Sequence, residues 1–107
     1  MHPSQYLAVA SFGNDTESDI TLYLEMLGEE VVMSPGHHIV LLAKPSPDLL
    51  PIAIHQVVQG MQVFPHREFD PDWHVRFNGK VIRAGHPLNL GDHEEAGVVR
   101  SKLLRQE

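Results

Sequence analysis

The sequence predicts an all-β fold, a small antiparallel β-sandwich or partly open barrel with an irregular C-terminal tail. Three observations carry this prediction. Apolar residues fall in about seven short blocks, with turn signals roughly every ten residues. Residues 20–26 alternate between apolar and polar side chains, the period of a strand with one buried face. Asn78-Gly79 is the pair favoured in the tight turn of a β-hairpin.

The first half of the chain divides into four expected strands. Residues 6–12 form the first, and we expect a hairpin through 13–19 to join it to the second at 20–26. Gly28 interrupts the second run and predicts a change of direction before a short third strand at 31–33.

Pro35-Gly36 is typical of the centre of a type II turn, and residues 37–43 resume as the fourth strand. Residues 39–42 are apolar without alternation, which suits a strand covered on both sides. Periodicity alone leaves a buried helical segment open, but the prolines at 35, 45 and 47 bracket the run too closely for a long helix. Residues 52–58 and 61–64 are two further strands, followed by a polar loop at 65–72.

Residues 73–83 form the clearest hairpin. If Asn78 and Gly79 are its two loop residues, the pairing of every other residue follows. One face of the hairpin, mainly apolar, then carries Trp73, Val75, Phe77, Lys80, Ile82 and Ala84. The other face, which we expect to meet solvent or a partner, carries His74, Arg76, Val81 and Arg83.

These strands predict a core and a domain boundary. The expected core residues are Leu22, Leu24, Val32, Ile39, Leu41, Ile54, Val63, Trp73, Val75 and Phe77. Residues 1–90 form a single β-domain, and residues 91–107 form a polar tail, either disordered or with a short helix at 98–104.

Composition excludes several classes of function. The 107 residues contain no cysteine, which rules out thiol catalysis and thiolate metal sites. A formal charge of -6 opposes binding to a phosphate backbone, so we expect no nucleic-acid partner. No apolar run reaches the length of a membrane span, and the N-terminus lacks a basic leader. We therefore expect a cytoplasmic protein that does not engage a membrane.

Eight histidines raise the question of a metal site. His37, His38 and His74 are the candidate ligands, because neutral imidazoles suit zinc, copper, nickel and iron. Neighbours on a strand point to opposite faces, however, and none of the usual spaced histidine motifs is present. Scattered surface imidazoles are the more common explanation, so we expect no cofactor.

Catalytic pairs are equally unsupported. Ser34 could pair with His37 or His38, and Asp72 with His74, but no surrounding motif supplies an oxyanion hole or an orienting acid. We therefore expect no catalytic residues and no enzymatic activity.

The polar phase of the second strand carries Glu25, which is either simply solvent-facing or a charge on a recognition surface. With His74, Arg76 and Arg83 it makes up the candidate interaction surface. The leading hypothesis is a non-enzymatic protein that acts through contacts with a protein partner, as an accessory or inhibitor-type module. The alternative is a histidine-rich protein that binds a transition metal or a small ligand.

The order of the turns also resembles that of a group of small bacterial β-sandwich domains. The shared features are an Asn14-Asp15-Thr16 turn, a strand ending in Glu25, Gly28-Glu29-Glu30, the Pro35-Gly36 turn and the Asn78-Gly79 hairpin. The likeness covers residues 11–83. It implies a β-domain and no particular activity.

Overall fold

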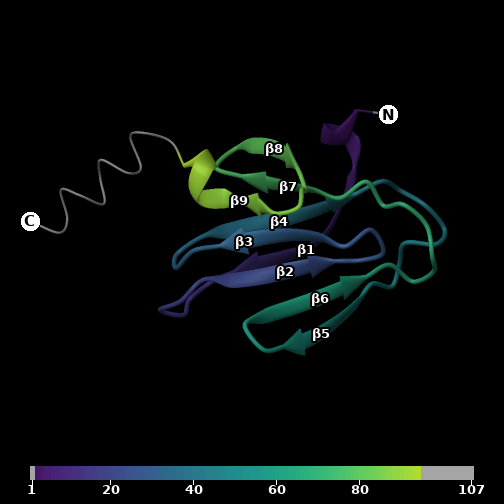
Figure 1. Cartoon of the computed structure of the whole chain (residues 1–107). Helices are drawn as coiled ribbons and strands as arrows, with labels where there is room; N and C mark the ends of the chain where they lie inside the picture. Colours follow the sequence, from purple (N-terminus) through teal and green to yellow (C-terminus); the bar gives the residue numbers. More distant parts are fainter. Residues whose placement is uncertain (1, 95–107) are drawn as a thin grey trace, which may run out of the picture.

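The computed structural model describes residues 2–94, which form two β-sheets packed face to face (Figure 1). This confirms the predicted all-β sandwich. In chain order the strands are β1 (Leu7–Gly13), β2 (Ile20–Leu24), β3 (Glu29–Met33), β4 (His38–Ala43), β5 (Ala53–Val57), β6 (Gly60–Phe64), β7 (His74–Phe77), β8 (Lys80–Arg83) and β9 (Leu88–Asn89). Two 3-10 turns flank them, η1 (Pro3–Gln5) and η2 (Leu90–His93).

The two sheets differ in strand number and in direction. One sheet has four strands in the order β1-β4-β7-β8, and the other has five in the order β5-β6-β2-β3-β9. All pairs in the first sheet are antiparallel, as predicted, but β2–β6 and β3–β9 are parallel. Gly60 permits the first of these pairings, because a Cβ at this position would lie 1.8 Å from the carbonyl oxygen of Thr21.

The predicted hairpin through residues 13–19 is wrong, because β1 and β2 belong to different sheets. The connection instead crosses from one sheet to the other, around the fully buried side chain of Asn14. Its Nδ2 donates hydrogen bonds of 2.8 Å to the carbonyl oxygens of Ser18 and Met33. Asn14 thus ties the end of β1 to the end of β3.

The other predicted turns are confirmed. Residues 25–28 turn β2 back onto β3. The His37 N–H donates to the Ser34 carbonyl oxygen at 3.0 Å, and Gly36 has a φ of 85°, as a type II turn requires. Asn78 and Gly79 have φ values of 50° and 77°, and Val75 pairs with Ile82 in the expected register.

Every predicted core residue except Val32 and Ile54 is buried. Val32 lies half-buried on the outer face of β3, between the inward-facing Val31 and Met33. Ile54 is 44% exposed, because β5 is an edge strand and its inner face is not fully covered. Trp73 is fully buried, and its Nε1–H donates to the Glu25 carbonyl oxygen at 2.7 Å.

The sandwich is closed along one side and open along the other. On the closed side the Glu30 N–H donates to the Gly85 carbonyl oxygen at 2.9 Å, which joins β3 to the chain just after β8. On the other side β1 and β5 each end their sheet within the described part of the chain. This side, between the free edges of β1 and β5, is the open side.

The predicted boundary before the C-terminal tail falls inside a 3-10 turn. The η2 turn crosses the expected division between residues 90 and 91, and the predicted short helix at 98–104 lies outside the described residues. Within residues 2–94, no helix is long and apolar enough to cross a membrane.

Candidate binding site

The candidate metal ligands do not come together. His37 is buried, whereas its neighbour His38 points outward into solvent, as expected for adjacent residues entering a strand. His74 lies at the opposite end of β7 from Phe77, the residue whose ring packs against His37 at 5.0 Å. Among residues 2–94, no three histidine, aspartate or glutamate side chains gather in a way that could hold a metal ion.

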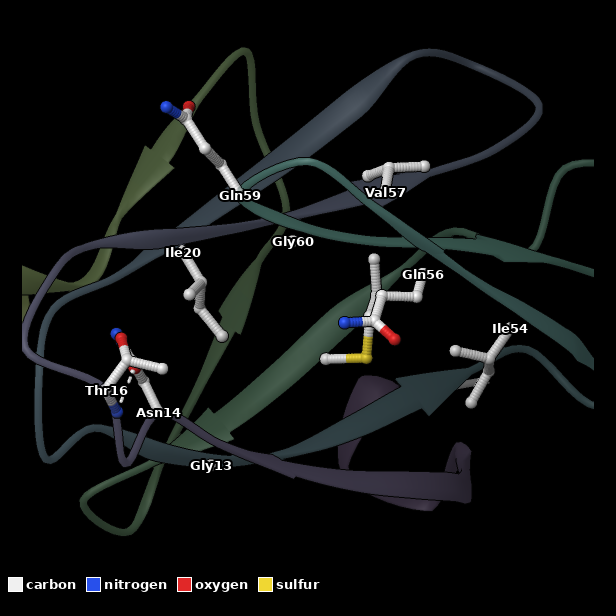
Figure 2. Close-up of a pocket in the computed structure, with 10 residues that line it drawn as sticks. Gly13, Asn14, Thr16, Ile20, Ile54, Gln56, Val57, Gln59 and Gly60 are labelled. Carbon is white, nitrogen blue, oxygen red and sulfur yellow. Dashed lines mark hydrogen bonds between the residues drawn. The ribbon is translucent and has the colours of Figure 1, made fainter.

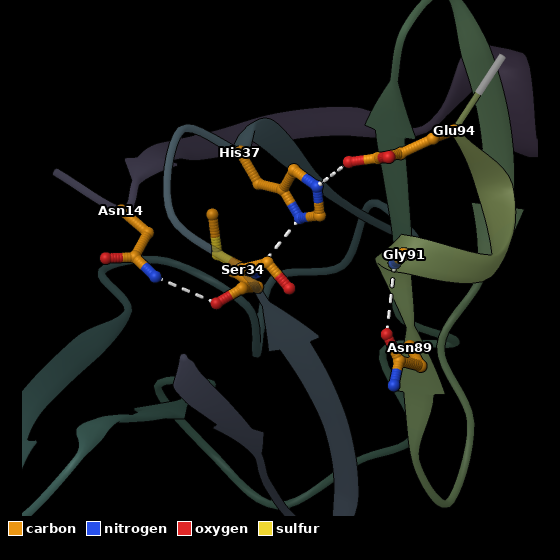
Figure 3. A network of polar contacts seen from close by, with 7 residues as sticks. Asn14, Ser34, His37, Asn89, Gly91 and Glu94 are labelled. Atoms are coloured by element: carbon orange, nitrogen blue, oxygen red, sulfur yellow. Dashed lines mark hydrogen bonds and ion pairs between the residues drawn. The ribbon is translucent and has the colours of Figure 1, made fainter. Parts of the chain in front are cut away.

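The two ring nitrogens of His37 instead make structural hydrogen bonds (Figure 3). Its Nδ1 accepts a hydrogen bond of 3.0 Å from the main-chain N–H of Ser34. The ring proton therefore sits on Nε2, which donates to Glu94 Oε1 at 2.5 Å. The Ser34 contact uses the backbone and not the hydroxyl, so it does not have the geometry of a serine-histidine pair.

His74 is also buried, and this corrects the expectation that it shares an open surface with Arg76 and Arg83. The ring of Tyr6 packs edge-on against His74 at 5.4 Å. His74 Nδ1–H donates to the main-chain oxygen of Asp72 at 2.7 Å, and so makes no contact of the kind a catalytic Asp-His pair uses. Sequence periodicity identifies the outer face of β7, but it does not show that an aromatic ring from the N-terminus covers it.

Asp72 connects this cluster to the surface. Its Oδ2 accepts a hydrogen bond of 2.6 Å from the Tyr6 hydroxyl, and this bond raises the pKa of Tyr6. Its Oδ1 lies 3.6 Å from Nε of the exposed Arg83, and an ion pair of this kind at the surface contributes little to stability. Asp72 thus holds Tyr6 over His74.

The four residues of the candidate interaction surface do not form one patch. Arg76 and Arg83 are exposed on the outer face of the four-stranded sheet. Glu25 follows β2 of the other sheet and is only half-exposed, with Gln62 Nε2 at 3.4 Å from its Oε2. With His74 buried, these residues do not define a common binding face.

Sequence analysis missed a buried carboxyl group at Glu29. The residue is 5% exposed, and its Oε1 has no hydrogen-bond partner. Burial raises the pKa of Glu29, while His86 and Arg83 oppose the shift. The alternation of β3 could have revealed this burial, because Glu29 lies on the same inward face as Val31 and Met33.

A groove of about 470 Å³ lies on the open side of the sandwich (Figure 2). Its lining residues are Gly13, Asn14, Thr16, Ile20, Ile54, Gln56, Val57, Gln59, Gly60 and Met61. Ile54 pairs with Val63 and Gln56 with Met61, so all four side chains belong to the inner face of the five-stranded sheet. The groove is therefore the part of the sandwich interior that the four-stranded sheet leaves uncovered.

The two strands that border the groove have unusually unprotected edges. β1 reads LAVASFG and β5 reads AIHQV, without a charged residue or a proline in either. Natural edge strands are commonly blunted by lysine, proline or a bulge, and here the protection is a register shift between Ala8 and Ala10 of β1. Both edges are chemically suited to contact another polypeptide.

Fold and groove together define the protein as a β-sandwich with one uncovered apolar side. The chain matches no family model, no curated protein and no solved structure. Its function is therefore inferred from the geometry of the groove.

Proposed function

We propose that the protein is a non-enzymatic binding module that docks an apolar part of a partner protein in the groove on the open side. One observation carries the proposal: an apolar cleft of about 470 Å³ lies between two uncharged strand edges. Contiguous uncovered apolar surface on a small domain marks an interaction site more often than an isolated exposed side chain does.

The binding free energy from filling the groove comes from burying apolar side chains that remain partly exposed in the folded protein. Ile54 is 44% exposed, and Ile20, Val57 and Met61 are half-buried. Complete burial of one such side chain is worth about 1.5–3 kcal/mol relative to full exposure, so finishing the burial of several supplies useful affinity. The small size of the module fits an accessory or inhibitor-type role.

A small apolar molecule is the second candidate occupant. The groove volume of about 470 Å³ lies within the usual range of ligand pockets, and Asn14, Gln56 and Gln59 add polar groups to an apolar lining. This candidate retains the ligand-binding alternative without requiring the histidines.

Site-specific photo-crosslinking tests the proposal. A photoreactive residue replaces Ile54 in the groove or, as a control, Val81, which is 36% exposed on β8 in the other sheet. After irradiation in cells, we expect a discrete protein adduct from position 54 and none from position 81. Adducts from both positions, or from neither, would contradict a protein partner in the groove. A small molecule would instead appear in the native mass spectrum of the purified protein.

A further inference from the structure

We infer that the segment bound in the groove is an extended strand of the partner that pairs with the free edge of β1 and completes the four-stranded sheet. This inference rests on the proposed function and specifies what the groove binds. In this mode, main-chain hydrogen bonds to a sheet edge provide affinity, and alternate side chains provide specificity.

The mismatch in strand number is the first argument. The five-stranded sheet extends past β1 through β6 and β5, whereas the opposite side of the sandwich is closed at Glu30 and Gly85 (Figure 1). A fifth strand beside β1 would lie over the inner face of β5 and β6. Its inward side chains would meet Ile54 and Gln56 (Figure 2) and also Met61, which are among the residues that line the groove.

The position of the groove selects β1 over β5 as the pairing edge. A strand added to β5 would lengthen the five-stranded sheet, which already extends beyond the four-stranded one. The inner face of β5 would then stay uncovered. A strand added to β1 would form the same kind of backbone hydrogen bonds as a strand added to β5, and it would also fill the groove. The regular part of the β1 edge, beyond the register shift, is residues 10–13, and Gly13 itself lines the groove.

The charges near the groove indicate the chemistry of the partner strand. Asp15, Glu17 and Asp19 are all exposed in the loop that follows β1, next to the groove residues Asn14 and Thr16. Of these three carboxylates, Asp15 has an ionic neighbour among residues 2–94, His38, whose Nε2 lies 3.8 Å from Asp15 Oδ1. A strand that carries lysine or arginine at the end beside this loop complements the acidic charge, and its alternate apolar residues fill the groove.

Synthetic peptides provide the test. Each has a core of alternating valine and threonine that matches the 7 residues of β1. Two lysines precede the core in one peptide and follow it in another, because an antiparallel and a parallel strand present opposite ends to the acidic loop. A third peptide carries glutamates instead of lysines. Binding to the full chain is followed by NMR at the amides of residues 10–13.

N-methylation separates strand pairing from simple apolar contact. Two versions of the binding peptide carry N-methyl groups on alternate residues, one version in each phase. An edge strand directs every second N–H toward its neighbour. We therefore expect one version to bind roughly tenfold more weakly or worse, and the other to bind like the parent peptide. The glutamate peptide should also bind more weakly, and Ile54→Glu should weaken binding of the parent.

Several outcomes would overturn the inference. Equal binding of both N-methylated versions would show that the groove holds side chains without strand pairing. Amide shifts confined to β5 would place the strand on the wrong edge, and a peptide-free dimer joined through β1 would make a second copy the occupant. Failure of every peptide to bind would also overturn it. Each of these results leaves the photo-crosslinking test at Ile54 intact, so the proposed function would stand or fall separately.

Discussion

At the scale of single residues, the polar groups that the fold buries are structural. Asn14 donates to two main-chain oxygens, His37 bridges Ser34 and Glu94, and His74 donates to the backbone of Asp72. Each directs hydrogen-bonding groups at protein atoms, and such contacts are what buried polar side chains require. Glu29 is the exception, because one of its buried carboxyl oxygens has no partner.

Glu29→Gln should stabilise the protein at neutral pH. Burial raises the pKa of Glu29, so the unfolded chain ionises at a lower pH than the folded chain. The free energy of unfolding of the wild type therefore falls as pH rises from the ordinary glutamate value, about 4.3, through the folded pKa. Glutamine removes this loss.

Urea unfolding measures the effect at pH about 3.5 and about 7.5, the two sides of the glutamate titration. We expect the stability of Glu29→Gln relative to the wild type to be greater at the higher pH. Glu30→Gln is the matched control, because Glu30 is the half-exposed neighbour on the opposite face of β3. If the stability difference between Glu29→Gln and the wild type were the same at both pH values, ionisation of Glu29 would not destabilise the folded protein.

At the scale of the elements, the best-predicted parts are those set by local chemistry. The Asn78-Gly79 turn fixes the register of β7 and β8 because positive φ is required at both positions. The unbroken apolar run of β4 indicated a strand covered on both sides, and Ile39, Leu41 and Leu42 are all buried.

Gly79→Val tests this turn directly. A β-branched side chain resists the φ of 77° at this position, so we expect a loss of about 1–3 kcal/mol in the free energy of unfolding. Lys80→Val is the control, because the adjacent strand position accepts a β-branched residue. Thermal and urea unfolding would measure both variants. Equal stability of Gly79→Val and the wild type would mean that the loop does not need positive φ in solution.

The parts that sequence analysis missed depend on partners distant in the chain. The missing Cβ of Gly60 leaves room for β6 to approach β2, but nothing in residues 60–64 indicates that the two strands run parallel. His74 looked solvent-facing because its cover, Tyr6, lies far away in sequence. Ile54 has the inward phase that predicts burial, but no strand formed by residues 2–94 lies beside β1 to cover it. The groove therefore follows from sheet order, which periodicity does not encode.

At the scale of the whole molecule, the central feature is an asymmetric sandwich. One side is closed by the Glu30–Gly85 hydrogen bond, and the other leaves β1 and β5 as free edges beside an apolar groove. A net charge of -6 opposes the approach of a second identical copy and agrees with the proposed partner strand that carries basic residues.

Amide hydrogen exchange of the free protein, resolved by NMR, tests most directly whether the open side is open in solution. In β5 (Ala53–Val57) each second amide points away from β6, so we predict alternating fast and slow exchange along the strand. In β4 (His38–Ala43), residues 40–42 pair with both β1 and β7, so we predict slow exchange at all three. Uniformly slow exchange in β5, matching that of β4, would mean that its edge is covered and would contradict the open-sided sandwich.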